Sequence, residues 1–108
     1  MKLVNLTPHI IHIFNNPDGT GEPVTIAPSG QVARVCTTDS PVDLPVDFPC
    51  FRTSLDEIVD LPPEEEGVLL ITSLIVRTSS DRADIASPGK LIRGTDGQPV
   101  GCYGLALN

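Results

Sequence analysis

Apolar residues along the chain come in short runs separated by turn-forming residues, a pattern that predicts strands rather than long helices. Eleven prolines and nine glycines are spread over 108 residues, so few stretches are long enough for a helix. Residues 9–14 alternate, so that His9 lies on the same strand face as Ile11 and Ile13, while His12 lies on the opposite face. Strands are expected in residues 3–14 (interrupted at Thr7-Pro8), 24–27, 31–38, 68–72, 90–93 and 100–107.

The segments between these runs have the composition of turns. Residues 15–21 combine Asn, Asp and Gly and predict a hairpin, and residues 94–98 contain the Asp-Gly pair that is a strong hairpin signal. Residues 68–72 are apolar at successive positions, which predicts a strand that is covered on both faces. Beyond Ser73 the pattern fits either a continued strand or one helical turn, over residues 74–79.

Residues 39–66 are rich in proline and are the least regular part of the chain. Thr53 or Ser54 is expected to cap a short helical turn over Leu55–Val59, where acidic residues in the first turn suit the helix dipole. The sequence leaves open whether this segment folds over the rest of the chain as a lid.

These elements predict one domain, residues 1–108, of the mainly β class. We expect a small antiparallel sheet curled into a barrel or sandwich, with one or two short helical turns; an α+β arrangement is the alternative. The core should consist mostly of Ile, Leu and Val, because Trp is absent and only four residues are Phe or Tyr.

The formal net charge is −7, and a negative chain repels nucleic-acid polymers. The charge is uneven: residues 1–66 hold eleven acids and three bases, whereas residues 67–108 hold three acids and four bases. A small anionic ligand would therefore be tolerated best among the arginines of the second half.

The three cysteines have no C-x-x-C spacing, the first residues do not have the pattern of a signal peptide, and no apolar run approaches the ~20 residues of a membrane span. We therefore expect a cytoplasmic protein with free thiols, no contact with a membrane, no metal site and no cofactor.

Two candidate site residues follow apolar strands. His9 comes directly after Pro8 and has the chemistry of a general base or a ligand donor, or else of a histidine that only bonds a backbone carbonyl. Ser73 ends the best buried strand, where its hydroxyl would bond a ligand or the backbone; no G-x-S-x-G turn surrounds it.

Three further candidates are charged. Arg82 has the planar fork that holds a carboxylate or phosphate, and Asp84 would orient Arg82 or accept from a ribose hydroxyl or a base amine. The alternative is a surface ion pair between the two. Arg34, in an apolar strand, either extends its charge to solvent at a sheet edge or neutralises an anion.

Several motifs together resemble a family of small bacteriophage and bacterial proteins that open with N-L-T-P-H. The matching segments cover nearly the whole chain in order: Asn5–His9, Gly30 with Ala33–Val35, Ile71–Ser73, Arg82-x-Asp84-Ile85-x-x-Pro88 and Gly101-Cys102. Leu70 stands where the family usually has an aromatic residue, and Thr72 where Val is usual. The resemblance implies a phage or prophage setting and no particular mechanism.

Three functions remain in competition. The first is a non-catalytic binding protein, expected to be a homo-oligomer, that holds a small phosphorylated or nucleotide-like ligand through His9, Arg34, Ser73, Arg82 and Asp84. In a phage, such a protein would be a sponge that sequesters a nucleotide immune signal of the host. The second is a small phosphoesterase or lyase using His9 as base, and the third is a structural or protein-binding accessory of a phage.

Overall fold

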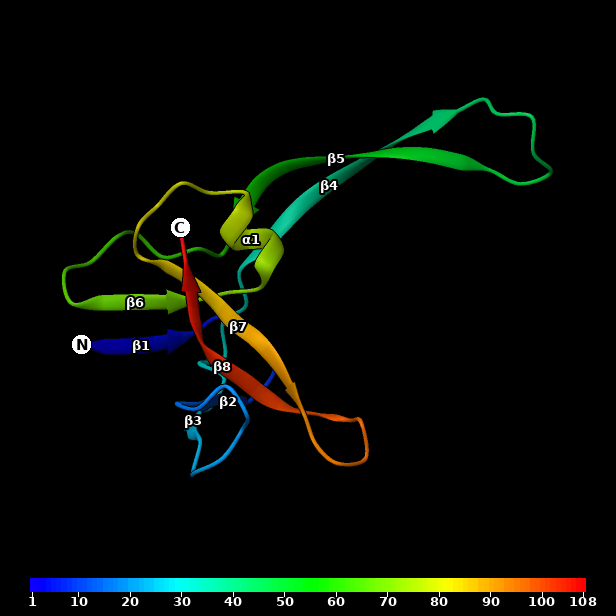
Figure 1. Cartoon of the computed structure of the whole chain (residues 1–108). Coiled ribbons are helices and arrows are strands. Elements are labelled where there is room, and N and C mark those ends of the chain that lie inside the picture. Colours follow the sequence, from blue (N-terminus) through cyan, green and yellow to red (C-terminus); the bar gives the residue numbers. More distant parts are fainter.

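The computed structural model describes all 108 residues and consists mainly of strands with one short helix (Figure 1). The prediction of a mainly β fold is therefore confirmed. In chain order the elements are β1 (Lys2–Asn5), β2 (Ile11–Phe14), β3 (Val24–Ile26), β4 (Arg34–Val42), β5 (Cys50–Val59), β6 (Val68–Ile71), α1 (Leu74–Thr78), β7 (Ile85–Arg93) and β8 (Pro99–Leu107).

Six strands form one sheet, in the order β1-β6-β7-β8-β2-β3, which curls until it is nearly closed like a barrel. The curled sheet agrees with the prediction, but its pairing is mixed. The pairs β1–β6, β6–β7 and β2–β8 are parallel, whereas β7–β8 and β2–β3 are antiparallel. β1 and β2 do not pair with each other but with strands from the second half of the chain, and the parallel strands β6 and β7 are joined through helix α1.

Strand β6 lies between two apolar clusters. Leu70 packs with Leu6, Ala33 and Val76 on one side, and Ile71 belongs to the second cluster. Leu70 and Ile71 are both essentially fully buried, so this strand is covered on both faces, as its continuous apolar run predicts. The second cluster consists of Ile11, Ile13, Ile71 and Cys102.

Helix α1 settles the open question about residues 74–79. Ser73 has extended backbone and its Oγ accepts a hydrogen bond from the Val76 amide at 3.4 Å, so it is the N-cap of the helix. Val76 is completely buried, and Arg77 Nε donates to Ser87 Oγ at 2.8 Å, which attaches α1 to β7. With five residues, α1 is the only helix, and the chain has no helix of the length and apolarity that crossing a bilayer requires.

The two hairpins expected from their turns are present. β2 and β3 pair antiparallel across residues 15–23, and β7 and β8 pair antiparallel across residues 94–98. In the second turn the Gly94 amide donates to the Gln98 carbonyl at 2.8 Å, and Gly97 has a φ of +81°, which glycine adopts readily.

The prediction of a helical turn over Leu55–Val59 is wrong, because these residues belong to strand β5. The hydroxyls that were expected to cap a helix bond across to β4 instead: Thr53 Oγ1 donates to Asp39 Oδ1 at 2.7 Å, and Ser54 Oγ donates to the Thr38 carbonyl at 3.2 Å. Pairing along the whole of β4 outweighs the local capping preference.

Strands β4 and β5 and the loop between them, residues 43–49, form a second, two-stranded sheet that extends away from the six-stranded sheet; we call residues 34–59 the arm (Figure 1). The outer part of the irregular segment therefore does not fold over the body of its own chain as a lid. The arm makes the molecule elongated, 52 × 39 × 23 Å. The radius of gyration is 16.8 Å, against about 13 Å for a compact domain of this length.

Candidate functional site

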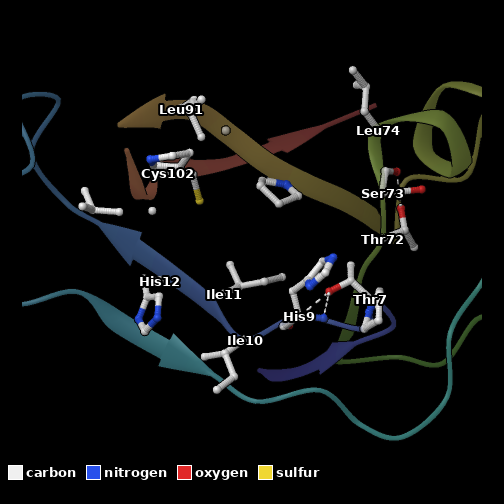
Figure 2. Close-up of a pocket in the computed structure, with 16 residues that line it drawn as sticks. Thr7, His9, Ile10, Ile11, His12, Thr72, Ser73, Leu74, Leu91 and Cys102 are labelled. Atoms are coloured by element: carbon white, nitrogen blue, oxygen red, sulfur yellow. Dashed lines mark hydrogen bonds between the residues drawn. The ribbon is translucent and has the colours of Figure 1, made fainter. Parts of the chain in front are cut away.

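A hollow of about 630 Å³ lies between the β1–β2 connection, the β6–α1 junction and the β7–β8 pair (Figure 2). This volume falls within the range of small-molecule sites, roughly 300–1,000 Å³. We call it the larger hollow. Its lining consists of Thr7–His12, Thr72–Leu74, Pro88, Gly89, Leu91 and Pro99–Cys102.

The buried side chain of Asn5 fixes the backbone that forms one wall of this hollow. Its Oδ1 accepts from both the amide and the hydroxyl of Thr7, at 2.9 and 2.7 Å. Its Nδ2 donates to the carbonyls of His9 and Ile26, at 2.8 and 3.1 Å. With 1% of its surface exposed, Asn5 thus uses its amide group entirely to hold the turn that presents Thr7, Pro8 and His9.

Sequence reasoning singled out His9 and missed Asn5 and Thr7. A signal was available, because an Asn two residues before a Thr is the spacing of an Asx turn, in which the side chain imitates a backbone hydrogen bond. In this fold the N-L-T-P-H segment therefore forms a turn that is held by hydrogen bonds of its own Asn5 and Thr7 side chains.

His9 precedes β2 and is exposed, and its imidazole projects into the larger hollow, with Thr72 and Ser73 across from it (Figure 2). Its backbone carbonyl accepts from Asn5 Nδ2, but neither ring nitrogen has a hydrogen-bond partner within the chain. The ring is therefore held in place by its backbone and remains available to a ligand. His12 differs, because its Nδ1 lies 3.2 Å from Thr25 Oγ1 on the neighbouring strand β3.

The two hydroxyls at the end of β6 have separate roles. Thr72 is completely buried, and its Oγ1 bonds the carbonyls of Ser73 and Ala86, at 3.0 and 3.3 Å. Ser73 Oγ accepts from the Val76 amide as the helix cap, which leaves the hydroxyl hydrogen of Ser73 free to donate to a ligand.

A second, smaller hollow of about 350 Å³ adjoins the first. Thr7, Pro8 and Ser73 line both hollows, so these residues form the wall between them. Arg34 lines the smaller hollow; it is exposed, and its guanidinium has neither a salt bridge nor a hydrogen bond within the chain. The structure thus places His9, Ser73 and Arg34 on two neighbouring hollows that share three lining residues.

Arg82 and Asp84 lie elsewhere, outside the lining of both hollows. They bond each other through two parallel hydrogen bonds, Nε to Oδ1 at 2.9 Å and Nη2 to Oδ2 at 2.6 Å, and Arg82 Nη1 donates to the Pro62 carbonyl at 3.0 Å. These bonds connect the segment before β7 to the segment before β6. Hydrogen bonding from Arg82 holds the pKa of the Asp84 carboxyl below its usual value.

The lining of the two hollows contains no carboxylate, although the chain carries fourteen acidic residues. A ligand with a negative group therefore meets no like charge in the wall, and Arg34 is the one permanently charged group there. Cys102 lies at the back of the larger hollow, where burial raises the pKa of its thiol and so disfavours the reactive thiolate.

Gly101 brings β8 close to β2 along this wall. A Cβ atom at Gly101 would lie 2.5 Å from the carbonyl oxygen of His12 and 2.7 Å from the ring of Phe14. Only glycine allows the parallel β2–β8 pair at this point, and with it the back wall of the larger hollow.

Comparison of the chain with models of protein families, with curated proteins and with solved structures finds no match. The resemblance to the phage family that opens with N-L-T-P-H therefore stays a prediction. The residues that line the two hollows are the evidence for a function.

Asn5→Ala should lower the free energy of unfolding by about 2–4 kcal/mol, because it leaves several backbone groups without partners in a buried place. Urea unfolding followed by circular dichroism measures this change. Asn16→Ala is the matched control: Asn16 also donates to a carbonyl, that of Thr20, but it is exposed, so its loss should cost about 0.5 kcal/mol or less. Equal losses in the two variants would contradict the role given to Asn5.

Arg82→Ala should lower the free energy of unfolding by about 1–3 kcal/mol at neutral pH, because the Asp84 side chain, 9% exposed, loses its partner. The pKa of Asp84 is lowered in the folded state, so the stabilisation is complete above the unfolded value of about 3.9 and is lost as the pH falls through the folded value. The difference between the wild type and Arg82→Ala should therefore shrink below about pH 4. Arg93→Ala, which removes an exposed arginine, is the control; a difference that persists in acid would refute the assignment.

Proposed function

We propose that this chain is a binding protein for a small anionic, nucleotide-like molecule, which occupies the two adjoining hollows and is not turned over. The observation that carries this proposal is the convergence of His9, Ser73 and Arg34, from three distant parts of the chain, on hollows without a carboxylate. Neither an arginine alone nor a histidine alone would support a binding site of this kind.

The larger hollow suits the flat, weakly polar part of such a ligand. Ile10, Leu91 and Val100 contribute apolar surface, and the His9 ring offers a flat face for stacking. The unpaired ring nitrogens of His9 supply hydrogen bonds to the edge of a base or to a sugar hydroxyl.

The smaller hollow suits the anionic group. The guanidinium of Arg34 presents the planar fork that binds phosphate or carboxylate with two hydrogen bonds. Ser73 stands in the wall that both hollows share, so its hydroxyl hydrogen can bond the ligand where the flat part meets the anionic part.

Binding without turnover is favoured over a phosphoesterase or lyase by the surroundings of His9. A histidine that acts as a general base is usually oriented by a second group, most often a carboxylate, and no carboxylate lines the hollow. Ser73 Oγ is committed to the Val76 amide, and it has no base within hydrogen-bond distance.

A protein that binds without turnover acts by withdrawing its ligand from other proteins. In the phage setting that the sequence resemblance implies, the withdrawn molecule would be a nucleotide immune signal of the host. Stoichiometric binding is sufficient for that role, and a chain of 108 residues can supply it.

Isothermal titration calorimetry with 5′-AMP and 3′,5′-cyclic AMP tests the proposal, with adenosine as the uncharged comparison. Arg34→Gln should weaken nucleotide binding at least tenfold, about 1.4 kcal/mol, and leave adenosine binding nearly unchanged, because the lost contact is to the phosphate. His9→Ala should weaken all three ligands.

Arg93→Gln is the matched control, since Arg93 is an exposed arginine that bonds the Gly97 carbonyl and lines neither hollow. Nucleotide recovered after incubation should be chemically intact, and product formation would favour the enzyme instead. Absence of binding to both nucleotides, or equal binding by Arg34→Gln and the wild type, would contradict the proposed ligand.

A further inference from the structure

The arm exposes apolar side chains that a protein normally covers. Two of the four aromatic residues of the chain, Phe48 and Phe51, lie near its tip with 64% and 57% of their surface exposed. Leu44 and Val46 add exposed aliphatic groups in the loop at the tip, and Leu55 adds another nearer the body. Such a cluster, concentrated on one projecting element, is typical of an interaction surface.

A two-stranded ribbon of this kind has little to stabilise it alone. From Thr37 to Glu57 nearly every arm residue is exposed, so neither face of the ribbon packs on the body, and its outer edges have no strand partner. Isolated two-stranded hairpins are marginally stable at best in water, so the arm requires a surface that covers it.

The total exposed area indicates how large that surface is. The chain exposes 7291 Å², about 1,500 Å² more than the roughly 5,800 Å² expected of a compact monomer of this mass. A standard protein–protein interface covers about 800 Å² on each partner. The excess is therefore close to the area of two such patches, one on the arm and one on the body.

The body carries a patch that matches the arm. Ile10, Leu74, Leu91 and Val100 surround the mouth of the larger hollow, with between 41% and 60% of their surface exposed; we call these four residues the rim. The arm of the same chain points away from the body, so it leaves the rim uncovered (Figure 1).

Charge decides between two ways of pairing copies. Residues 36–57 of the arm carry Asp39, Asp43, Asp47, Asp56 and Glu57 against Arg52 alone, so two arms would repel each other. Residues 67–108, which supply three of the four rim residues, have one base more than their acids, whereas residues 1–35 and 58–66 have a net charge of −4. On charge, an arm is therefore better placed on the rim of another copy than on another arm.

We propose that the chain associates with a second copy of itself by arm exchange, in which the arm of each copy packs on the rim of the other. The apolar arm tip covers the exposed rim, and the acidic arm lies on the part of the body whose bases outnumber its acids. Both complementary patches belong to one sequence, so reciprocal exchange satisfies both at once. If the proposed function holds, the partner's arm also closes the open side of the ligand site.

The oligomeric state of the ligand-free protein tests this proposal, by size-exclusion chromatography with light scattering. The wild type should have at least twice the 11.5 kDa mass of the chain. Leu44→Asp with Phe48→Asp should be monomeric; both residues lie in the loop 43–49, outside the strands, so the fold is preserved. Leu91→Asp, on the rim, should also be monomeric.

Mixing the two variants gives the sharpest result. The arm variant retains a good rim and the rim variant retains a good arm, so an equimolar mixture should form a heterodimer with one intact contact. Val24→Asp is the control, since Val24 is as exposed as Leu91, 51%, but lies on β3 outside both hollows; it should remain associated. Circular dichroism checks that each variant is folded.

A monomeric wild type, an associated arm variant or a dissociated Val24→Asp would overturn arm exchange. An associated Leu91→Asp variant, or failure of the two variants to pair when mixed, would overturn the placement of the arm on the rim. Because no ligand is present, these outcomes are independent of the calorimetry: nucleotide binding can fail while association persists, and the reverse.

Discussion

The side-chain amide of Asn5 connects the turn that follows β1 to the end of β3, although β1 and β3 are not neighbours in the sheet. Its Oδ1 accepts hydrogen bonds from the amide and hydroxyl of Thr7, and its Nδ2 donates to the carbonyls of His9 and of Ile26, the last residue of β3. Leu6, the next residue, is buried in the apolar cluster with Leu70 and Val76. The wall between the two hollows is therefore held by the fully hydrogen-bonded side chain of Asn5, next to an apolar cluster. Such fully bonded networks define a single local geometry.

The sequence predicted best what local chemistry alone determines. The apolar run at Val68–Ile71 and the Asp96-Gly97 turn each correspond to one structure, and both are present. Thr53 and Ser54 misled because their hydroxyls suit a helix cap and a cross-strand bond equally well, and only the presence of β4 decides between these. The mixed pairing of the large sheet was likewise beyond local reasoning, since it depends on which distant strand each edge meets.

The candidate site was predictable in part for the same reason. His9 and Ser73 flank strands, and the fold brings strand ends together, so their convergence could be anticipated in kind. Arg82 and Asp84 are two residues apart, a spacing at which a guanidinium reaches its own neighbour, and that ion pair is what forms. No local pattern in the sequence predicts that all fourteen acidic side chains lie outside the lining of the two hollows.

The parallel pairs in the large sheet determine when the fold can form during synthesis. Lys2 pairs with Val68, and Ile13 with Cys102, so β1 has no partner until β6 has been synthesised, and β2 lacks one of its two neighbours until β8 has been. The loops between such distant strands close slowly. Sheets built from distant segments fold in about milliseconds to seconds, which is slow for small domains. Until β6 and β8 emerge, only the β2–β3 and β4–β5 hairpins have their pairing strands available. Until β6 has been synthesised, the nascent chain must therefore keep β1 from aggregating.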